Sequence, residues 1–381
     1  MKNDRIWGLD LIRAFAVLSV LVIHTADLTP DKMDGFINTI RFDGVLYFFV
    51  LSGFLIGNIL IRSFEKSLKF TDVFNFWVRR WFRTLPNYFL FLILLMLLLG
   101  EYKLRIIKYI FFTQNFYKPI SDFFPESWSL AIEEWFYLLL PLSILLINKM
   151  LKISVKRSLF VIIISVVLIS PIIRFLMSNY YHVNDFISWD FHIRSVAICR
   201  FDSIIWGLFG AFISYYYSAI WVKYKKTLLV FGLVGIIFIK ALELKFGWEF
   251  MHSQSTGIMA LYLTIQPLLI LTLLPFLSTF KVNKENTFTK SITKVSLISY
   301  SISYSIYLVN YSLVKGYILH NLEKIFNSYI PVDYLTIILV VLFWLLSISI
   351  PLFIYKYYEL PMMNLRDKIK FERIKNVFNK K

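Results

Sequence analysis

The sequence predicts an all-α, polytopic integral membrane protein with about ten transmembrane helices and both termini in the cytoplasm. Hydrophobic residues make up 58% and aromatic residues 19% of the 381 residues, whereas soluble domains contain about 45–50% apolar residues. The apolar residues gather in stretches of about 20, the length that crosses a bilayer. Lys and Arg give a net charge of +17. They lie in short clusters between the apolar stretches, a pattern typical of cytoplasmic loops and not of nucleic-acid binding.

Ten stretches are long and apolar enough to be the predicted spans. We find no repeat that would divide the chain, so residues 1–381 are expected to form a single transmembrane domain with a basic cytoplasmic tail over about 356–381. Residues 101–127 contain a basic, apolar run that suits a helix lying on the membrane surface. In order, the expected spans are residues 9–27, 44–61, 84–100, 128–148, 158–177, 195–216, 228–244, 257–279, 295–313 and 334–355.

The distribution of basic residues gives the predicted orientation. With a cytoplasmic N-terminus, 27 of the 41 Lys and Arg residues fall in inside segments and 12 in outside segments or at the external ends of spans, and Arg13 and Arg200 are left deeper within spans. Cytoplasmic loops of membrane proteins are enriched in Lys and Arg. We therefore expect a multi-pass protein of the cell's inner (plasma) membrane, with Arg13 in the cytoplasmic half of the first span and His24 near its external end.

The first span is unusual because it carries both Arg13 and His24. A charged side chain in a membrane helix costs about 2.5–3.5 kcal/mol on insertion scales, so such a residue points to function. The two are eleven residues apart, which returns to within about 20° of the same helix face and separates them by about 16 Å along the axis. We expect both to look into one space, as a fixed cation and a general base. The alternative is that Arg13 snorkels to the near interface and His24 marks the helix end.

The second span contains Gly53 and Gly57, whose spacing of four lets helices approach closely, and we interpret both as packing residues. The cytoplasmic segment after it places Arg79, Arg80 and Arg83 within about one helical turn, among aromatic residues. Arg80 and Arg83 share a helix face and can hold two phosphate oxygens. On composition alone, a membrane anchor of interfacial Trp and Arg residues is the stronger interpretation.

The fourth span begins with Trp128, Ser129, Glu133 and Glu134 at its external mouth. Glu133 lies one turn into an apolar run, where a carboxylate needs a partner or must stay protonated. His24 is expected at the same depth, so a His24–Glu133 pair is geometrically feasible. A carboxylate on one imidazole nitrogen fixes the tautomer and raises the basicity of the other nitrogen. The alternative is a carboxylate at a water-filled vestibule, without chemistry.

The loop before the sixth span supplies two histidines and two aspartates, His182, Asp185, Asp190 and His192. Their spacing matches no compact set of metal ligands, and the single cysteine, Cys199, excludes an internal disulfide and a cysteine-based metal site. We therefore expect no metal and a polar loop that meets a sugar.

Arg200 and Asp202 enter the sixth span close together. They can neutralise each other, and we favour such an ion pair over a contact with substrate, which stays open.

Taken in order, these segments resemble the membrane-bound acyltransferase-3 family of integral-membrane O-acyltransferases. The arginine, ten residues and histidine at Arg13 and His24 look like its first-helix signature, and GVLYFFVLSGFLI is similar to its second-helix pattern. RRWFRTLP resembles its arginine-x-x-arginine motif at Arg80 and Arg83, and ESWSLAIEEWFY its tryptophan-serine-leucine box with Glu133. CRFDSIIWG, SYSIYL and YYELP follow in the family's order. The resemblance covers roughly residues 5–365.

The resemblance implies transfer of an acetyl or other short acyl group from cytoplasmic acyl-CoA, commonly acetyl-CoA, to a hydroxyl of an extracytoplasmic cell-surface polysaccharide or lipid-linked glycan. The expected partners are therefore acyl-CoA, the glycan and membrane lipids. Direct transfer and a covalent acyl-histidine relay are both open. The expected functional residues are His24, Glu133 and Arg13 for catalysis, Arg80 and Arg83 with neighbouring Arg79 for CoA, and Arg200, Asp202 and Asn310 as candidate substrate contacts.

The chain departs from the family in two respects. Many members have a histidine where this chain has Asn310, so the role of that position is open. Many also carry a C-terminal SGNH-type hydrolase domain that completes the transfer. Residues 1–381 include no such hydrolase domain, so we expect the chain to finish the transfer alone or to hand the acyl group to a separate protein.

A transporter or exporter of a polar or glycan substrate is the competing class, because it too would carry charges inside the membrane. The spans show no paired broken helices and no internal repeat, which are typical of carriers. A membrane scaffold is a third class, but it leaves Arg13, Glu133 and Arg200 without a reason for their cost. Binding of acyl-CoA is expected of the enzyme alone.

Overall fold

The computed structural model describes residues 6–30, 33–100, 105–119, 123–246, 256–280 and 301–365. Within these ranges the chain forms helices joined by turns and loops and contains no strand, so the all-α prediction is confirmed. Eight of the described helices are long and apolar enough to cross a membrane. The chain is therefore a polytopic membrane protein.

The long helices follow the predicted spans. They are α1 (Trp7–Ala26), α3 (Gly44–Phe64), α4 (Phe70–Leu99), α6 (Ser127–Leu151), α7 (Val155–Tyr180), α9 (Phe201–Tyr216), α11 (Lys225–Phe246), α13 (Thr256–Thr279) and α16 (Val332–Ile354). The ninth predicted span, 295–313, lies partly outside the described residues; its described part is helical over 301–309 and continues as a π-helix, Asn310–Leu319. Most of the predicted tail, from residue 366, also lies outside them.

Short helices connect the long ones. They are α2 (Asp34–Ile40), α5 (Ile106–Ile110), α8 (Phe186–Trp189), α10 (Ser218–Lys223), α15 (His320–Phe326) and α17 (Leu360–Leu365). A π-helix, Tyr355–Glu359, joins α16 to α17. The basic, apolar run after residue 101 forms α5 in its described part.

Two helix starts differ from the prediction. α4 begins at Phe70 and not at residue 84, because the Asp72 carboxylate accepts the backbone N–H of Lys69 and closes the first turn. The arginine segment therefore belongs to the third spanning helix. α9 begins at Phe201 and not at residue 195, because the residues before it form a π-helix, Asp190–Arg194, and a 3-10 helix, Ala197–Cys199.

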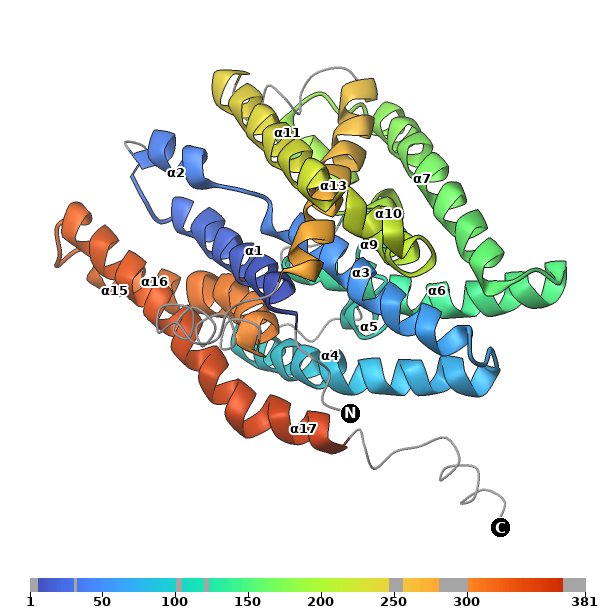
Figure 1. The fold of residues 1–381 in the computed structure, drawn as a ribbon. Coiled ribbons are helices and arrows are strands. Elements are labelled where there is room, and N and C mark those ends of the chain that lie inside the picture. Colours follow the sequence, from blue (N-terminus) through green and yellow to red (C-terminus); the bar gives the residue numbers. More distant parts are fainter. Residues whose placement is uncertain are drawn as a thin grey trace, which may run out of the picture.

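Helix α3 lies at the centre of the bundle, between α1 on one side and α9 and α13 on the other (Figure 1). A Cβ on Gly53 would lie 2.0 Å from the carbonyl oxygen of Ile204 in α9, so only glycine allows this approach. A Cβ on Gly57 would lie 2.7 Å from that of Ala211, one turn further along the same contact. The interpretation of both glycines as packing residues is confirmed.

Candidate functional site

The two polar residues of α1 open into two different cavities. Arg13 lines a cavity of about 1100 Å³ together with Asp10 and, from α3, Asn58 and Arg62. We call it the Arg13 cavity. His24 lines a second cavity, of about 420 Å³, at the other end of α1. This His24 cavity shares none of its described lining residues with the first.

The expectation that Arg13 and His24 look into one space is therefore wrong. On the inward side of α1, the residues between them, including Ala16, Val17 and Val20, are buried against the bundle. Helix α3 approaches α1 most closely here, because a Cβ on Gly44 would lie 2.2 Å from the carbonyl oxygen of Ala16. A shared helix face does not give a shared cavity when a neighbouring helix crosses that face.

The imidazole of His24 is held by Asn310. Nδ1 of His24 is hydrogen-bonded to Oδ1 of Asn310. The amide nitrogen of Asn310 donates to the backbone carbonyls of Ile306 (2.7 Å) and Tyr307 (3.0 Å), which turns Oδ1 toward His24. Because Oδ1 only accepts hydrogen bonds, Nδ1 must carry the proton. Nε2 then keeps its lone pair and can act as a base.

A change of helix type places Asn310 at this point. The helix of residues 301–309 widens at Asn310 into the π-helix that runs to Leu319. Such widened turns are rare and frequently occur at functional sites. The next residue, Tyr311, packs its ring 4.7 Å from that of His24, centroid to centroid. Asn310 is fully buried and lines neither cavity in the described structure. It therefore acts by positioning His24 and not by contacting a molecule in the cavity.

A charged network forms another wall of the His24 cavity. Arg194 forms ion pairs with Asp43 at the start of α3 (3.2 Å) and with Asp190 (2.8 Å). Burial alone would lower the pKa of Arg194, but the two carboxylates raise it above its usual value. The guanidinium also lies over the ring of Trp128, 4.9 Å from its centroid. Asp190 is thus the residue of the polar loop that reaches this cavity.

Glu126 is a further carboxylate in the lining of the His24 cavity. Its Oε1 accepts the backbone N–H of Ser312 at 3.2 Å, and its Oε2 accepts the Ser312 hydroxyl. Burial raises the pKa of Glu126 to about 7, although both hydrogen bonds oppose this effect. The Tyr307 hydroxyl donates a hydrogen bond to the backbone carbonyl of Glu126 (3.1 Å) and accepts one from the Ser129 hydroxyl (2.7 Å). These bonds fix the start of α6 against the helix that holds Asn310.

Glu133 lies in a different cluster from His24. Its carboxylate accepts hydrogen bonds from Ser52 in α3 (3.1 Å) and from Tyr137 (2.8 Å). Arg80 in α4 donates to the Tyr137 hydroxyl (2.7 Å) and lies 3.8 Å from the carboxylate. Arg13 acts on Glu133 electrostatically as well. The structure thus places Glu133 beside Arg80 and within reach of the charge of Arg13, and it pairs His24 with Asn310.

The three arginines of α4 do not point to one place. Arg80 is half-buried, stacked on the ring of Tyr137 with 4.1 Å between guanidinium carbon and ring centroid. Arg79 is exposed, and the charge of Arg83 acts on Glu359. Residues 80 and 83 lie on adjoining parts of the helix surface, but Arg80 lies beside Glu133, whereas the charge of Arg83 acts on Glu359. Their role in binding CoA stays a prediction.

The expected ion pair between Arg200 and Asp202 is wrong. Asp202 is paired with Arg174 of α7 through two hydrogen bonds of 2.9 and 2.8 Å, and both side chains are fully buried. Arg200 precedes α9, and its guanidinium has no hydrogen-bond partner among the described residues; it lies 5.9 Å from the centroid of the Phe49 ring. Residues two apart around a helix point to different sides, which separates them.

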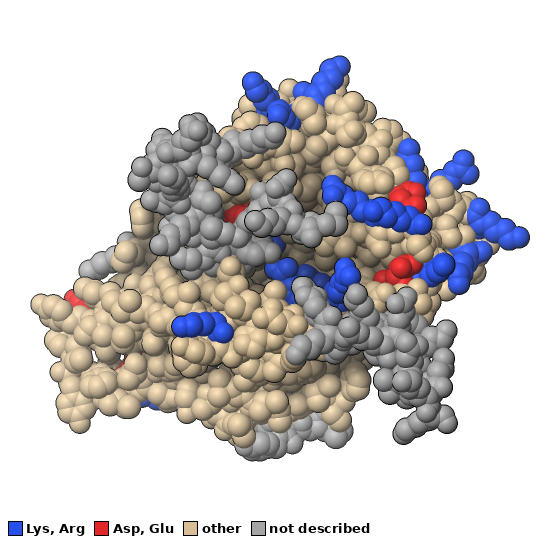
Figure 2. All heavy atoms as spheres, turned by 60° about the horizontal axis from the view of Figure 1, so that its bottom comes forward, with Lys and Arg blue, Asp and Glu red and all other residues tan. Residues whose placement is uncertain are grey.

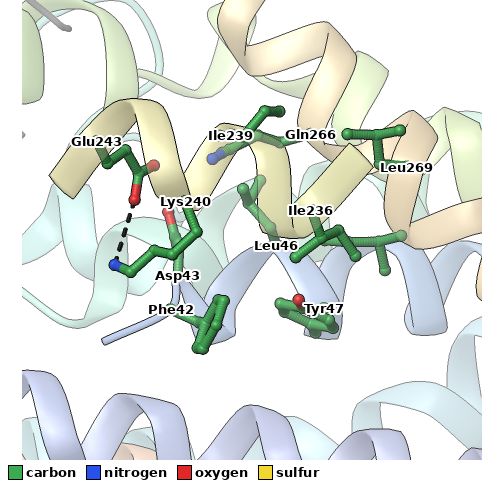
Figure 3. Close-up of a pocket in the computed structure, with 11 residues that line it drawn as sticks. Phe42, Asp43, Leu46, Tyr47, Ile236, Ile239, Lys240, Glu243, Gln266 and Leu269 are labelled. Carbon is green, nitrogen blue, oxygen red and sulfur yellow. Dashed lines mark hydrogen bonds and ion pairs between the residues drawn. The ribbon is translucent and has the colours of Figure 1, made fainter. Parts of the chain in front are cut away.

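A small crevice on the far side of Asp43 is not a second substrate site. It lies between α3, α11 and α13 and has a volume of about 40 Å³ (Figure 3). Figure 3 shows Lys240 and Glu243 paired at one end, 3.3 Å apart, and Tyr47 and Leu46 at its floor. A volume of this size holds water and not a sugar.

The remaining polar residues of the loop do not assemble a metal site. Among the described residues, no group of three or more His, Cys, Asp and Glu side chains is placed to hold a metal ion. His192 stacks on the ring of Tyr181 at 4.1 Å, and Asp185 caps α8 by accepting the backbone N–H of Ser188.

Sequence reasoning missed Glu126, and it did not find the contact through which Asn310 acts. Glu126 is the first residue of the segment that resembles the tryptophan-serine-leucine box, where an acidic residue looks like an ordinary helix cap. The sequence pattern that could have revealed it is a carboxylate just before a membrane span, followed by the polar residue Ser127. For Asn310, no pattern in the sequence announces a π-helix, so its contact with His24 could not be derived.

Comparison with known proteins places these residues in context. The family model described as an acyltransferase domain matches residues 6–356. The O-acetyltransferase OatA of Staphylococcus aureus (strain NCTC 8325 / PS 47) is 35% identical over 175 residues, which is 41% of this chain and 27% of OatA. A putative O-acetyltransferase of Staphylococcus aureus (strain COL) is 33% identical over 171 residues, 40% of this chain and 26% of that protein. The matched region thus spans about a quarter of these relatives. No solved structure matches the chain.

Proposed function

Because the chain belongs to the acyltransferase-3 family, we propose that it moves an acetyl group from acetyl-CoA to a hydroxyl of a cell-surface glycan. The observation that carries the proposal is the pairing of His24 with Asn310, which leaves an unprotonated Nε2 at the wall of a cavity large enough for a sugar unit. The relatives named O-acetyltransferase support oxygen as the acceptor atom and acetyl as the group.

This geometry supports the following course of the transfer. Nε2 of His24 takes the proton of the acceptor hydroxyl as its oxygen attacks the thioester carbonyl carbon. The carbon–sulfur bond then breaks, the new ester forms, and the CoA thiolate leaves and takes up a proton. Asn310 holds the imidazole in the tautomer that this step needs. An acyl-histidine relay would use the same Nε2 as nucleophile and yields the same products.

We assign the donor to the Arg13 cavity. Arg13 and Arg62 line it, and guanidinium groups suit the phosphates of CoA. Exposed basic residues surround the ends of the neighbouring helices, among them Lys66, Lys149, Lys152 and Lys223. Figure 2 shows Lys and Arg side chains clearly outnumbering Asp and Glu side chains on the face it brings forward. Excess basic charge is typical of the cytoplasmic side, which supports acetyl-CoA entering from the cytoplasm and the glycan lying outside.

The test uses the purified protein in liposomes with acetyl-CoA and digested cell-wall or capsule glycans. His24→Ala should abolish acetyl transfer, by about 10²–10⁴-fold as expected for loss of a general base, while acetyl-CoA binding measured by calorimetry is kept. His320→Ala is the matched control, because His320 is an exposed histidine paired with Glu323. Full transfer by His24→Ala would refute the assignment. Failure of well-folded wild-type protein to bind acetyl-CoA would favour a transporter.

A further inference from the structure

The His24 cavity contains a carboxyl group that the transfer step does not use. Glu126 lines this cavity and is 5% exposed. Its two neighbouring carboxylates, Asp43 and Asp190, are both ion-paired with Arg194. Glu126 makes no ion pair within the described part of the chain, and its hydrogen-bond partner is the neutral Ser312. A buried carboxylate without a cation lowers stability, so its presence calls for a reason.

The carboxyl group is fixed and still has capacity to bind. Ser312 occupies one position on each of its two oxygens. A carboxylate offers about four lone-pair sites, and its own backbone N–H takes one more, so one site stays open for another donor. The backbone of Glu126 is held by Tyr307, whose hydroxyl bridges to Ser129. The group is therefore pre-oriented as an acceptor of hydrogen bonds.

The other walls of the cavity suit a ring with hydroxyl groups. Trp128, Phe191, Tyr307 and Tyr311 line it, and all four present an apolar face, to which Trp and Tyr add a polar group at the edge. Its volume of about 420 Å³ lies within the range of small-molecule sites. Aromatic faces pack on the C–H groups of a sugar ring, while a carboxylate accepts its hydroxyl protons.

We propose that Glu126 binds the acceptor sugar, accepting a hydrogen bond from a hydroxyl next to the one that His24 deprotonates. This inference rests on the proposed function and names its acceptor class: an uncharged sugar unit. An ionised Glu126 without a cation repels a carboxylate or phosphate on the ring that faces it, so acidic sugars are excluded from this position.

The test compares uncharged and acidic oligosaccharide fractions, prepared from digested bacterial cell walls and capsules, as acceptors in liposomes. Wild-type protein should acetylate the uncharged fraction. Glu126→Gln keeps the shape of the side chain but loses the charge and one acceptor oxygen, so it should raise KM for the glycan at least tenfold and leave KM for acetyl-CoA unchanged. Glu323→Gln is the matched control, because Glu323 is exposed and lines neither cavity.

The pH dependence provides an independent readout. The titratable and charged groups that face this cavity are His24 from α1, Asp43 before α3, Asp190 and Arg194 from the π-helix, and Tyr307 and Tyr311. Protonation of Glu126 should raise the glycan KM below about pH 7 in wild-type protein, and this rise should be missing in Glu126→Gln. Protonation of His24 acts on kcat instead. Ser312→Ala removes one hydrogen bond to the carboxylate and should move the rise in KM to higher pH.

Each outcome decides a separate point. Acetylation of the uncharged fraction with the same glycan KM in Glu126→Gln would show that Glu126 does not bind the acceptor. Acetylation restricted to the acidic fraction would overturn the assignment of an uncharged sugar. Acetylation of neither fraction by protein that binds acetyl-CoA would overturn the proposed function itself, and with it this inference.

Discussion

Replacing Asn310 tests how His24 is prepared for proton transfer. Asn310→Ala removes the oxygen that accepts the Nδ1 proton of His24 and the amide that is bonded to Ile306 and Tyr307. One such hydrogen bond is worth about 0.5–1.5 kcal/mol, which corresponds to a fall in kcat of up to about tenfold. Loss of the correct histidine tautomer in a catalytic triad lowers kcat by about 10⁴-fold. We expect a fall between these limits.

Asn310→Asp separates the two functions of the amide. The carboxylate still offers an oxygen to Nδ1 of His24, and its charge stabilises the imidazolium formed during transfer. Its oxygens cannot donate to the carbonyls of Ile306 and Tyr307. We expect Asn310→Asp to recover much of the activity that Asn310→Ala loses.

The assay is kcat in liposomes at saturating acetyl-CoA, with acetyl-CoA binding measured separately to show that the donor site is intact. Nitrogen NMR of histidine-labelled protein, which contains five histidines, should show one ring protonated at Nδ1 in the wild type and lose that signal in Asn310→Ala. A kcat of Asn310→Ala within twofold of wild type, with the Nδ1-protonated signal retained, would refute the tautomer argument.

Three further predictions concern stability, measured by thermal unfolding in detergent. Because the pKa of Glu126 is raised from 4.5 to about 7, the fold loses stability as the pH rises from about 4.5 to 7, and Glu126→Gln should stabilise it by up to about 3 kcal/mol at pH 8 and not at pH 4. Arg174→Met should cost about 3–5 kcal/mol by leaving buried Asp202 unpaired, and adding Asp202→Leu should restore most of it. Gly53→Ala should cost about 1–3 kcal/mol, whereas Gly35→Ala, with no atom within 4 Å, should not.

The sequence was sufficient for the helices because their signal is local. A run of about 20 apolar residues must form a helix in a bilayer, since its backbone groups find no water there. The predicted spans therefore match the helices within a few residues in most cases. The start of α4 was misplaced because its first turns are amphipathic and fall below the hydropathy of a span.

The partners of the charged residues could not be predicted because they depend on how helices are rotated against each other. Glu133 was assigned to His24 from equal depth, yet depth does not say which faces meet. Ser52 and Tyr137 bring Glu133 to Arg80 instead. Asp202 likewise meets Arg174 from another helix and not its neighbour in sequence. Sequence identified the unusual residues correctly but not their contacts.

The separation of the two cavities sets a condition on the proposed transfer. The donor thioester must travel from the Arg13 cavity to His24, about 16 Å along α1 at 1.5 Å per residue. The layer between them includes Ala16 and Val17, packed where α1 meets α3 near Gly44. Transfer therefore requires α1 and α3 to part, and the thin arm of CoA suits such a path better than a whole nucleotide. Glu133 of α6 lies 3.8 Å from Arg80 of α4, and the charge of Arg13 of α1 acts on it as well. Binding of CoA phosphates by Arg13 or Arg80 would weaken the attraction between that arginine and Glu133. Arrival of the donor would thereby be coupled to opening of the path.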